Sequence, residues 1–200
     1  MINLLALQPG HRVLHFGGDE AALHAAVGAG GMVTATALDA ALPYNANSFD
    51  AAWVQERLAG LEDPAGALGE LAWVVRAGGR ILLCEADWAS LAISSEDRAT
   101  TSIVLGEIAA GRGDTGRHLP RLLAAAGCHR ISIAAETLVL DLTVLDEVAG
   151  LAIARDHCVR ARKISAETAT AWWEGLQELD RDGGFYGALT FVRAVGEVMG

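Results

Sequence analysis

Residues 15–21, which read HFGGDEA, constrain this chain more than any other segment. They follow a short apolar run at 12–16 and lead into an alanine-rich run at 19–27, which predicts a strand, a glycine turn and a helix. Such a turn lets the backbone approach an anionic group and points free helix N–H groups at it. Here Asp19 and Glu20 stand at the start of the helix, where they either repel an anion or complement the helix dipole.

Length and composition indicate a single domain over residues 1–200. The apolar fraction is 52% and only 20% of residues are charged, which excludes a disordered chain and predicts a sizeable core. The formal net charge is −10. Because nucleic acids and anionic membranes are bound mainly through Lys and Arg, we expect neither as a partner.

The chain lacks the features of membrane and secreted proteins. No apolar run reaches the roughly 18–20 residues that span a bilayer, and the first residues, MINLL, lack the pattern of a signal peptide. We therefore expect a cytoplasmic protein. Cys84, Cys128 and Cys158 are widely spaced and odd in number, so we expect reduced, buried thiols and no metal site.

Strand and helix patterns alternate along the rest of the chain. Continuous or alternating apolar runs predict strands at 32–37, 50–54, 80–85, 128–140 and 185–195. Caps and helical periodicity predict helices at 64–75, 94–111, 117–126, 144–163 and 166–180. This order predicts a layered α/β domain.

Several segments resemble one enzyme family. They are 42–44 (LPY) with 47–51 (NSFDA), 62–64 (EDP) through 76–80 (RAGGR), 85–88 (EADW), 116–120 (GRHLP) and 185–190 (FYGALT). In these segments the chain resembles class I S-adenosylmethionine (SAM)-dependent methyltransferases, in the branch related to ubiquinone and menaquinone C-methyltransferases. The resemblance implies a Rossmann-like fold, with a mostly parallel twisted sheet and an antiparallel last strand. It also implies a small-molecule substrate, such as an intermediate of secondary metabolism.

The cofactor loop departs from the family pattern. The family reads Asp/Glu-x-Gly-x-Gly-x-Gly, and its positions fall on His15, Gly17, Asp19 and Ala21, so one of the three glycines remains. The acid that holds the SAM ribose in the family falls near Ala37, where no carboxylate stands. We therefore expect no bound cofactor.

The resemblance leaves only a few residues that could contact SAM. If it binds, the resemblance points to Gly17, Gly18 and Asp39, the last being similar to the family acid that contacts adenine.

A deletion accompanies this change. Twelve residues separate Ala37 from Asp50, and Pro43 lies among them, which disfavours a helix there. One helix and one strand of the first half are therefore expected to be absent, which leaves 32–37 at an edge of the sheet. An exposed apolar edge favours a homodimer or a partner enzyme.

The expected carboxyl ends of the strands carry the candidate site residues. His15, Glu85 and Asp87 are candidates for acid–base catalysis. Candidates for substrate binding are Trp53, Gln55, Trp88, Arg112 and Arg117.

Three functions remain open from the sequence. The first is SAM-independent chemistry, such as cyclisation, isomerisation or elimination, on a methyltransferase scaffold. The second is a compact, active SAM-dependent methyltransferase. The third is a non-catalytic partner of a pathway enzyme.

Overall fold

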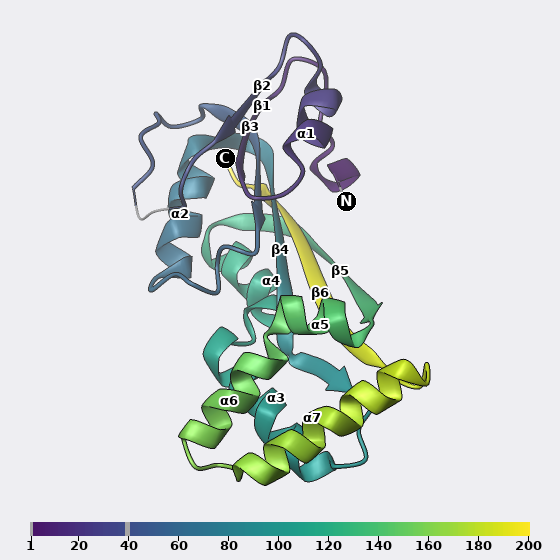
Figure 1. Cartoon of the computed structure of the whole chain (residues 1–200). Helices are drawn as coiled ribbons and strands as arrows, with labels where there is room; N and C mark the ends of the chain where they lie inside the picture. Colours follow the sequence, from purple (N-terminus) through teal and green to yellow (C-terminus); the bar gives the residue numbers. More distant parts are fainter. Residues whose placement is uncertain (1, 39–40) are drawn as a thin grey trace. The chain divides into compact units, whose positions relative to one another are not determined.

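The structure is a computed structural model, and it describes residues 2–38 and 41–200 (Figure 1). Asp39, one of the predicted SAM contacts, lies outside the described residues. In chain order the elements are η1 (Ile2–Leu5), β1 (Arg12–Phe16), α1 (Glu20–Val27), β2 (Met32–Ala35), β3 (Phe49–Gln55), α2 (Pro64–Val74), β4 (Val75–Ile93), α3 (Arg98–Arg112), α4 (Thr115–Ala125), β5 (Cys128–Leu140), α5 (Leu142–Ala149), α6 (Leu151–Arg160), α7 (Ala166–Arg181) and β6 (Gly187–Val198).

The strands form one mixed sheet in the order β2-β1-β3-β4-β6-β5. Strand β1 pairs in parallel with β2 and β3, and β3 pairs in parallel with β4. The last strand runs the other way, because Ser94 N donates to Tyr186 O and, further along, Thr190 N donates to Ser90 Oγ. The predicted Rossmann-like sheet with an antiparallel last strand is therefore confirmed.

The predicted absence of one helix and one strand from the first half is also confirmed. Among the described residues between β2 and β3, namely 36–38 and 41–48, there is neither helix nor strand. Strand β2 is consequently an edge of the sheet.

The described chain divides into two compact units. One comprises the residues up to Ala86, Thr115–Ala135 and Val192–Gly200, and the other comprises Asp87–Asp114 and Glu136–Phe191. We call them the sheet unit and the helical unit. Strands β4, β5 and β6 each supply residues to both units. A single domain over 1–200 stays a prediction.

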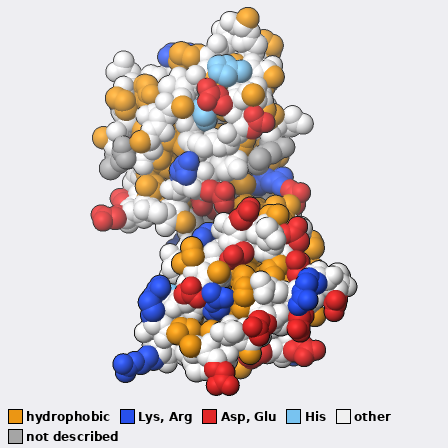
Figure 2. All heavy atoms as spheres, viewed as in Figure 1, with side chains coloured by type: hydrophobic (Ala, Val, Ile, Leu, Met, Phe, Trp, Pro, Cys, Tyr) orange, Lys and Arg blue, Asp and Glu red, His pale blue; other side chains and the backbone are white. Residues whose placement is uncertain are grey.

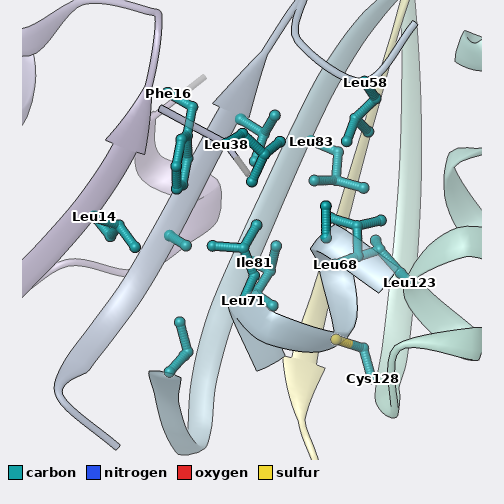
Figure 3. Packing of buried hydrophobic residues seen from close by; sticks show 14 of the residues in the cluster. Leu14, Phe16, Leu38, Leu58, Leu68, Leu71, Ile81, Leu83, Leu123 and Cys128 are labelled. Carbon is teal, nitrogen blue, oxygen red and sulfur yellow. The ribbon is translucent and has the colours of Figure 1, made fainter. Parts of the chain in front are cut away.

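Side chains in the sheet unit alternate between two apolar clusters, as the pleat of a strand requires. Leu14, Ala52 and Leu83 belong to a large cluster that includes the apolar side of α2 and residues of α4 (Figure 3). Val13, Trp53 and Leu82 belong to a second cluster, with residues of η1 and α1. We call these two sides of the sheet the α2 face and the α1 face.

The helical unit contains α3, α5, α6 and α7. Trp172 of α7 is 3% exposed, and its indole Nε1 donates to Thr101 Oγ1 at 2.9 Å. The sequence predicted one continuous helix over 144–163, and this prediction is wrong. Gly150 takes a left-handed conformation (φ 70°, ψ 44°) that ends α5 and begins α6.

Strand β4 is longer than the predicted 80–85. Gly79 permits the extension toward the N-terminus, because a Cβ there would lie 2.6 Å from Asp50 O on β3. A register shift between Phe49 and Ala51 accommodates these extra residues as a bulge.

The three cysteines are free and buried. Among residues 2–38 and 41–200, no helix is long and apolar enough to cross a membrane.

Candidate functional site

The loop after β1 lies directly on β3. Gly17 and Gly18 have positive φ angles of 82° and 86°. A Cβ on Gly18 would lie 2.8 Å from the Trp53 ring, and one on Gly17 would lie 2.9 Å from Gln55 O. Both positions therefore require glycine for backbone conformation and for close approach to β3. Both glycines therefore take part in the packing of the loop against β3.

Acidic side chains occupy the start of α1. Asp19 is the N-cap, and its carboxylate accepts a hydrogen bond from Ala22 N at 3.0 Å. Glu20 lies in the first turn, 3.5 Å from His24 Nε2. Figure 2 shows acidic and histidine side chains together over the region that α1 occupies in Figure 1. The amide N–H of Ala22, a free donor of the first helical turn, thus has a partner within the chain. Two carboxylates lie where the loop meets the helix.

His15 lies beneath this loop at the end of β1 and is 5% exposed. Its Nδ1 lies 3.0 Å from Gly17 O. Since a carbonyl oxygen only accepts, this hydrogen bond places a proton on Nδ1. Nε2 lies 3.8 Å from Glu20 Oε2, and a neutral ring with this tautomer would point a lone pair at a carboxylate.

Two predicted substrate-binding residues lie on the same α1 face of the sheet. Trp53 is the register partner of His15 and is 1% exposed. Gln55 follows two residues later, so its side chain emerges on the same side. Trp53 Nε1, Gln55 Oε1 and His15 Nε2 are buried atoms without a hydrogen-bond partner among the described residues. The structure therefore brings together His15, Gly17, Gly18, Trp53 and Gln55.

Glu85 emerges on the opposite, α2 face, because β4 alternates from Leu82 on the α1 face to Leu83 on the α2 face. It is 3% exposed, and its Oε1 accepts hydrogen bonds at 2.8 Å from Arg57 N and from Leu58 N. Burial raises the pKa of Glu85, although these two hydrogen bonds oppose the rise. The structure does not assemble His15 and Glu85 as an acid–base pair.

Three further candidates belong to the helical unit. Asp87 is 8% exposed and has interactions of its own. The guanidinium of Arg112 lies 4.2 Å from the centroid of the Trp88 ring and donates to Val148 O at 2.9 Å. Trp88 and Arg112 are therefore each other's partners. Arg117 lies on α4 in the sheet unit and is also engaged.

Sequence reasoning missed two charged residues beside the loop. It treated Glu20 only as a charge at the helix start, whereas the structure places it next to His15. The Arg57 side chain lies 3.8 Å from the position of a Cβ on Gly17 and is exposed. Its location just after the end of β3 is the sequence feature that could have identified Arg57 as a residue near the loop.

The helical unit has a groove of about 400 Å³, lined by Trp172 and by the acidic side chains Glu96, Asp97, Glu178 and Asp182. No candidate residue from the sequence lines it. Within the described residues, no group of three or more His, Cys, Asp or Glu side chains is arranged to hold a metal ion.

Residues 3–83 match the Methyltransf_11 family, described as a methyltransferase domain. An uncharacterized 37.1 kDa protein in transposon Tn4556 of Streptomyces fradiae is 34% identical over 161 residues, which cover 78% of this chain and 45% of that protein. The chain thus spans less than half the length of this relative.

Solved structures share the fold at low identity. YcgJ from Bacillus subtilis has a TM-score of 0.58 and BH2331 from Bacillus halodurans one of 0.55, each at 14% identity over 100% of this chain and 97% of that chain. Haemonchus contortus phosphoethanolamine N-methyltransferase 2, in complex with phosphomonomethylethanolamine and S-adenosylhomocysteine, has a TM-score of 0.53 at 13% identity. That match covers 100% of this chain and 51% of the other.

Gly18→Ala tests the contact between the loop and β3. Gly10→Ala is the matched control, since Gly10 has a φ of 90° and nothing within 4 Å of an added Cβ. Strain at positive φ costs about 1–2 kcal/mol in both variants, and overpacking against Trp53 adds about 1–3 kcal/mol in Gly18→Ala alone. Urea unfolding measures both. Equal losses for the two variants would contradict the contact.

Glu85 substitutions test the role of its carboxylate. Glu85→Ala leaves two backbone N–H groups unpaired and should lower the free energy of unfolding by about 2–4 kcal/mol, whereas Glu85→Gln keeps an accepting oxygen. Because the folded pKa is raised from 4.5, the carboxyl contributes stability below that value and loses it as pH rises through the folded pKa. Urea unfolding across that range should therefore show that the free energy of unfolding of Glu85→Gln rises relative to that of the wild type as pH increases. A constant difference would refute this.

Proposed function

We propose that this protein is a member of the class I SAM-dependent methyltransferase family and that it performs acid–base chemistry on a small molecule without transferring a methyl group. The match of residues 3–83 and the fold shared with solved structures support the first part of the proposal. The observation that carries the proposal is the loop after β1. Gly17 and Gly18 of this loop pack against Gln55 and Trp53. Helix α1, which follows the loop, has Asp19 as its N-cap and Glu20 as its first residue.

The residues at the family's cofactor positions fit SAM poorly. His15 occupies the position at the end of β1 where the family has an acidic residue. The acidic residue that holds the SAM ribose in the family falls near Ala37, which is exposed and has no carboxylate. Asp19 already uses the amide of Ala22, so a carboxylate on a ligand would compete for that donor and meet two negative side chains. The proposed reaction therefore does not use SAM.

His15 is the proposed acid–base group, and Glu20 rather than Glu85 is its carboxylate partner. The hydrogen bond to the Gly17 carbonyl occupies Nδ1 as a donor, so Nε2 is the ring atom that can exchange a proton with a substrate. In the proposed reaction Nε2 takes a proton from one substrate atom and, after the rearrangement, returns it to another. An isomerisation or cyclisation of this kind balances without a co-reactant.

The other predicted site residues keep supporting roles in this proposal. Glu85 holds the backbone of 57 and 58 after β3, beside the loop. Catalysis by Asp87 and substrate binding by Trp88, Arg112 and Arg117 stay predictions.

A second candidate is an active SAM-dependent methyltransferase, favoured by the match of residues 3–83 to the family. In that case Gly17, Gly18 and Asp39 are the expected cofactor contacts, as the sequence predicts. A third is a partner subunit or homodimer, favoured by the edge strand β2, where Met32 is 38% exposed. A cytoplasmic location remains part of the proposal.

Isothermal titration with SAM and with S-adenosylhomocysteine tests the proposal. We expect no binding tighter than about 1 mM for the wild type. The triple variant Asp19→Gly, Glu20→Thr, Ala21→Gly restores the two missing glycines of the family's loop and removes both carboxylates, so it should bind at least about tenfold more tightly.

The matched control, Asp63→Gly with Glu62→Thr, removes two acidic residues next to the N-terminus of α2 and should leave binding unchanged. Micromolar binding of SAM by the wild type would overturn the proposal and restore the methyltransferase.

A further inference from the structure

The five tryptophans of the chain differ in what covers their rings. Trp53 and Trp172 are buried, with exposed fractions of 1% and 3%. An arginine guanidinium lies over two others, 4.2 Å from the ring centroid of Trp88 and 5.0 Å from that of Trp173. Trp73, near the end of α2, is 51% exposed, and within residues 2–38 and 41–200 no cation lies over its ring. Its aromatic face is therefore accessible to a ligand.

Trp73 lines an open groove of about 580 Å³ in the sheet unit, between α2 and the segment before β3. Glu70 lies one turn earlier on α2, so both side chains project from the same side of the helix. The other side of the groove comes from 42–45, which read LPYN. Tyr44 in this segment packs edge-on against buried Phe49, with the ring centroids 4.9 Å apart. Two aromatic rings and one carboxylate thus line the same groove.

The chain's own contacts fix both sides of this groove. Leu42 N donates to Glu70 Oε2 at 3.5 Å, and Asn47 N donates to Trp73 O at 3.1 Å. Tyr44 N donates to Leu42 O at 2.8 Å, which closes a tight turn between the two contacts. Because the segment is attached to α2 at two points, the groove exists without a ligand. Binding there does not carry the cost of ordering a loop.

The charge of the groove favours a cation. Glu70 Oε1 has no hydrogen bond or ion pair with any residue that the structure describes. No basic side chain from the described part of the chain lines the groove, and the formal net charge of the protein is −10. The face of an indole ring carries partial negative charge, so a neighbouring carboxylate and the ring attract the same positive group. An anion would be repelled by both.

We propose that Trp73, Tyr44 and Glu70 form a binding site for the ammonium group of a small organic cation. The aromatic rings contact the carbon atoms around the nitrogen and stabilise its charge, and the carboxylate balances that charge. The proposal goes beyond the acid–base function. None of the residues assigned to that reaction lines the groove, so the two sites can be tested separately.

Titration of the full chain with three probes tests the site. Tetramethylammonium carries its charge within four methyl groups, tert-butanol has a similar size without the charge, and potassium ion has the charge without the methyl groups. The NMR shift of the Trp73 indole N–H, assigned by its loss in Trp73→Leu, reports binding. We expect tetramethylammonium to bind about three- to thirtyfold more tightly than tert-butanol, and potassium to leave the resonance unchanged.

Matched variants locate the charge that the cation meets. Glu70→Gln keeps an oxygen that accepts from Leu42 N but removes the charge, so the preference for tetramethylammonium over tert-butanol should fall about two- to fivefold. Glu174→Gln is the control, because it removes an exposed carboxylate next to Trp173, whose ring Arg155 already covers. It should leave the preference unchanged.

Trp73→Leu should abolish the preference, and the side-chain amide resonances of Asn45, which also lines the groove, report binding in that variant. Equal binding of tetramethylammonium and tert-butanol by the wild type would overturn the site. A preference that survives Trp73→Leu, or that falls equally in the two glutamate variants, would contradict it as well. A peptide with a trimethylated lysine that binds at least about tenfold more tightly than tetramethylammonium would exclude a small-molecule ligand in favour of a protein partner.

Discussion

The contact between Gly18 and the ring of Trp53 is the interaction on which this account depends. It holds the loop after β1 against β3, so that both glycines serve the chain's own packing. With the loop in this position, Asp19 caps α1 and Glu20 lies beside His15. The loop thus lies over a buried histidine and a buried indole. The proposed acid–base chemistry depends on this arrangement.

Most of the fold was predictable from the sequence because local signals were strong. Asp19, Asp63 and Asp97 mark helix starts, and each accepts a hydrogen bond from the helix it caps. The missing layer followed from the short segment before Asp50. The break at Gly150 and the long β4 were missed, because apolar periodicity does not reveal one left-handed glycine or a bulge beside Gly79.

The site was only partly predictable. The sequence identifies residues at the ends of strands, but not the face on which each side chain emerges, since that depends on register. His15, Trp53 and Gln55 share one face, while Glu85 lies on the other and binds the backbone after β3. Glu20 replaces Glu85 as the carboxylate nearest His15, which a strand-end rule cannot foresee. Trp88 and Arg112 belong to a separate unit, where they contact each other.

A crystal structure of the protein grown with millimolar SAM would show whether the loop stays on Trp53. We expect the Trp53 ring in contact with Gly18, Asp19 bound to the amide of Ala22, and no cofactor beside the loop. SAM seated next to Gly17, with the loop lifted from Trp53, would contradict it.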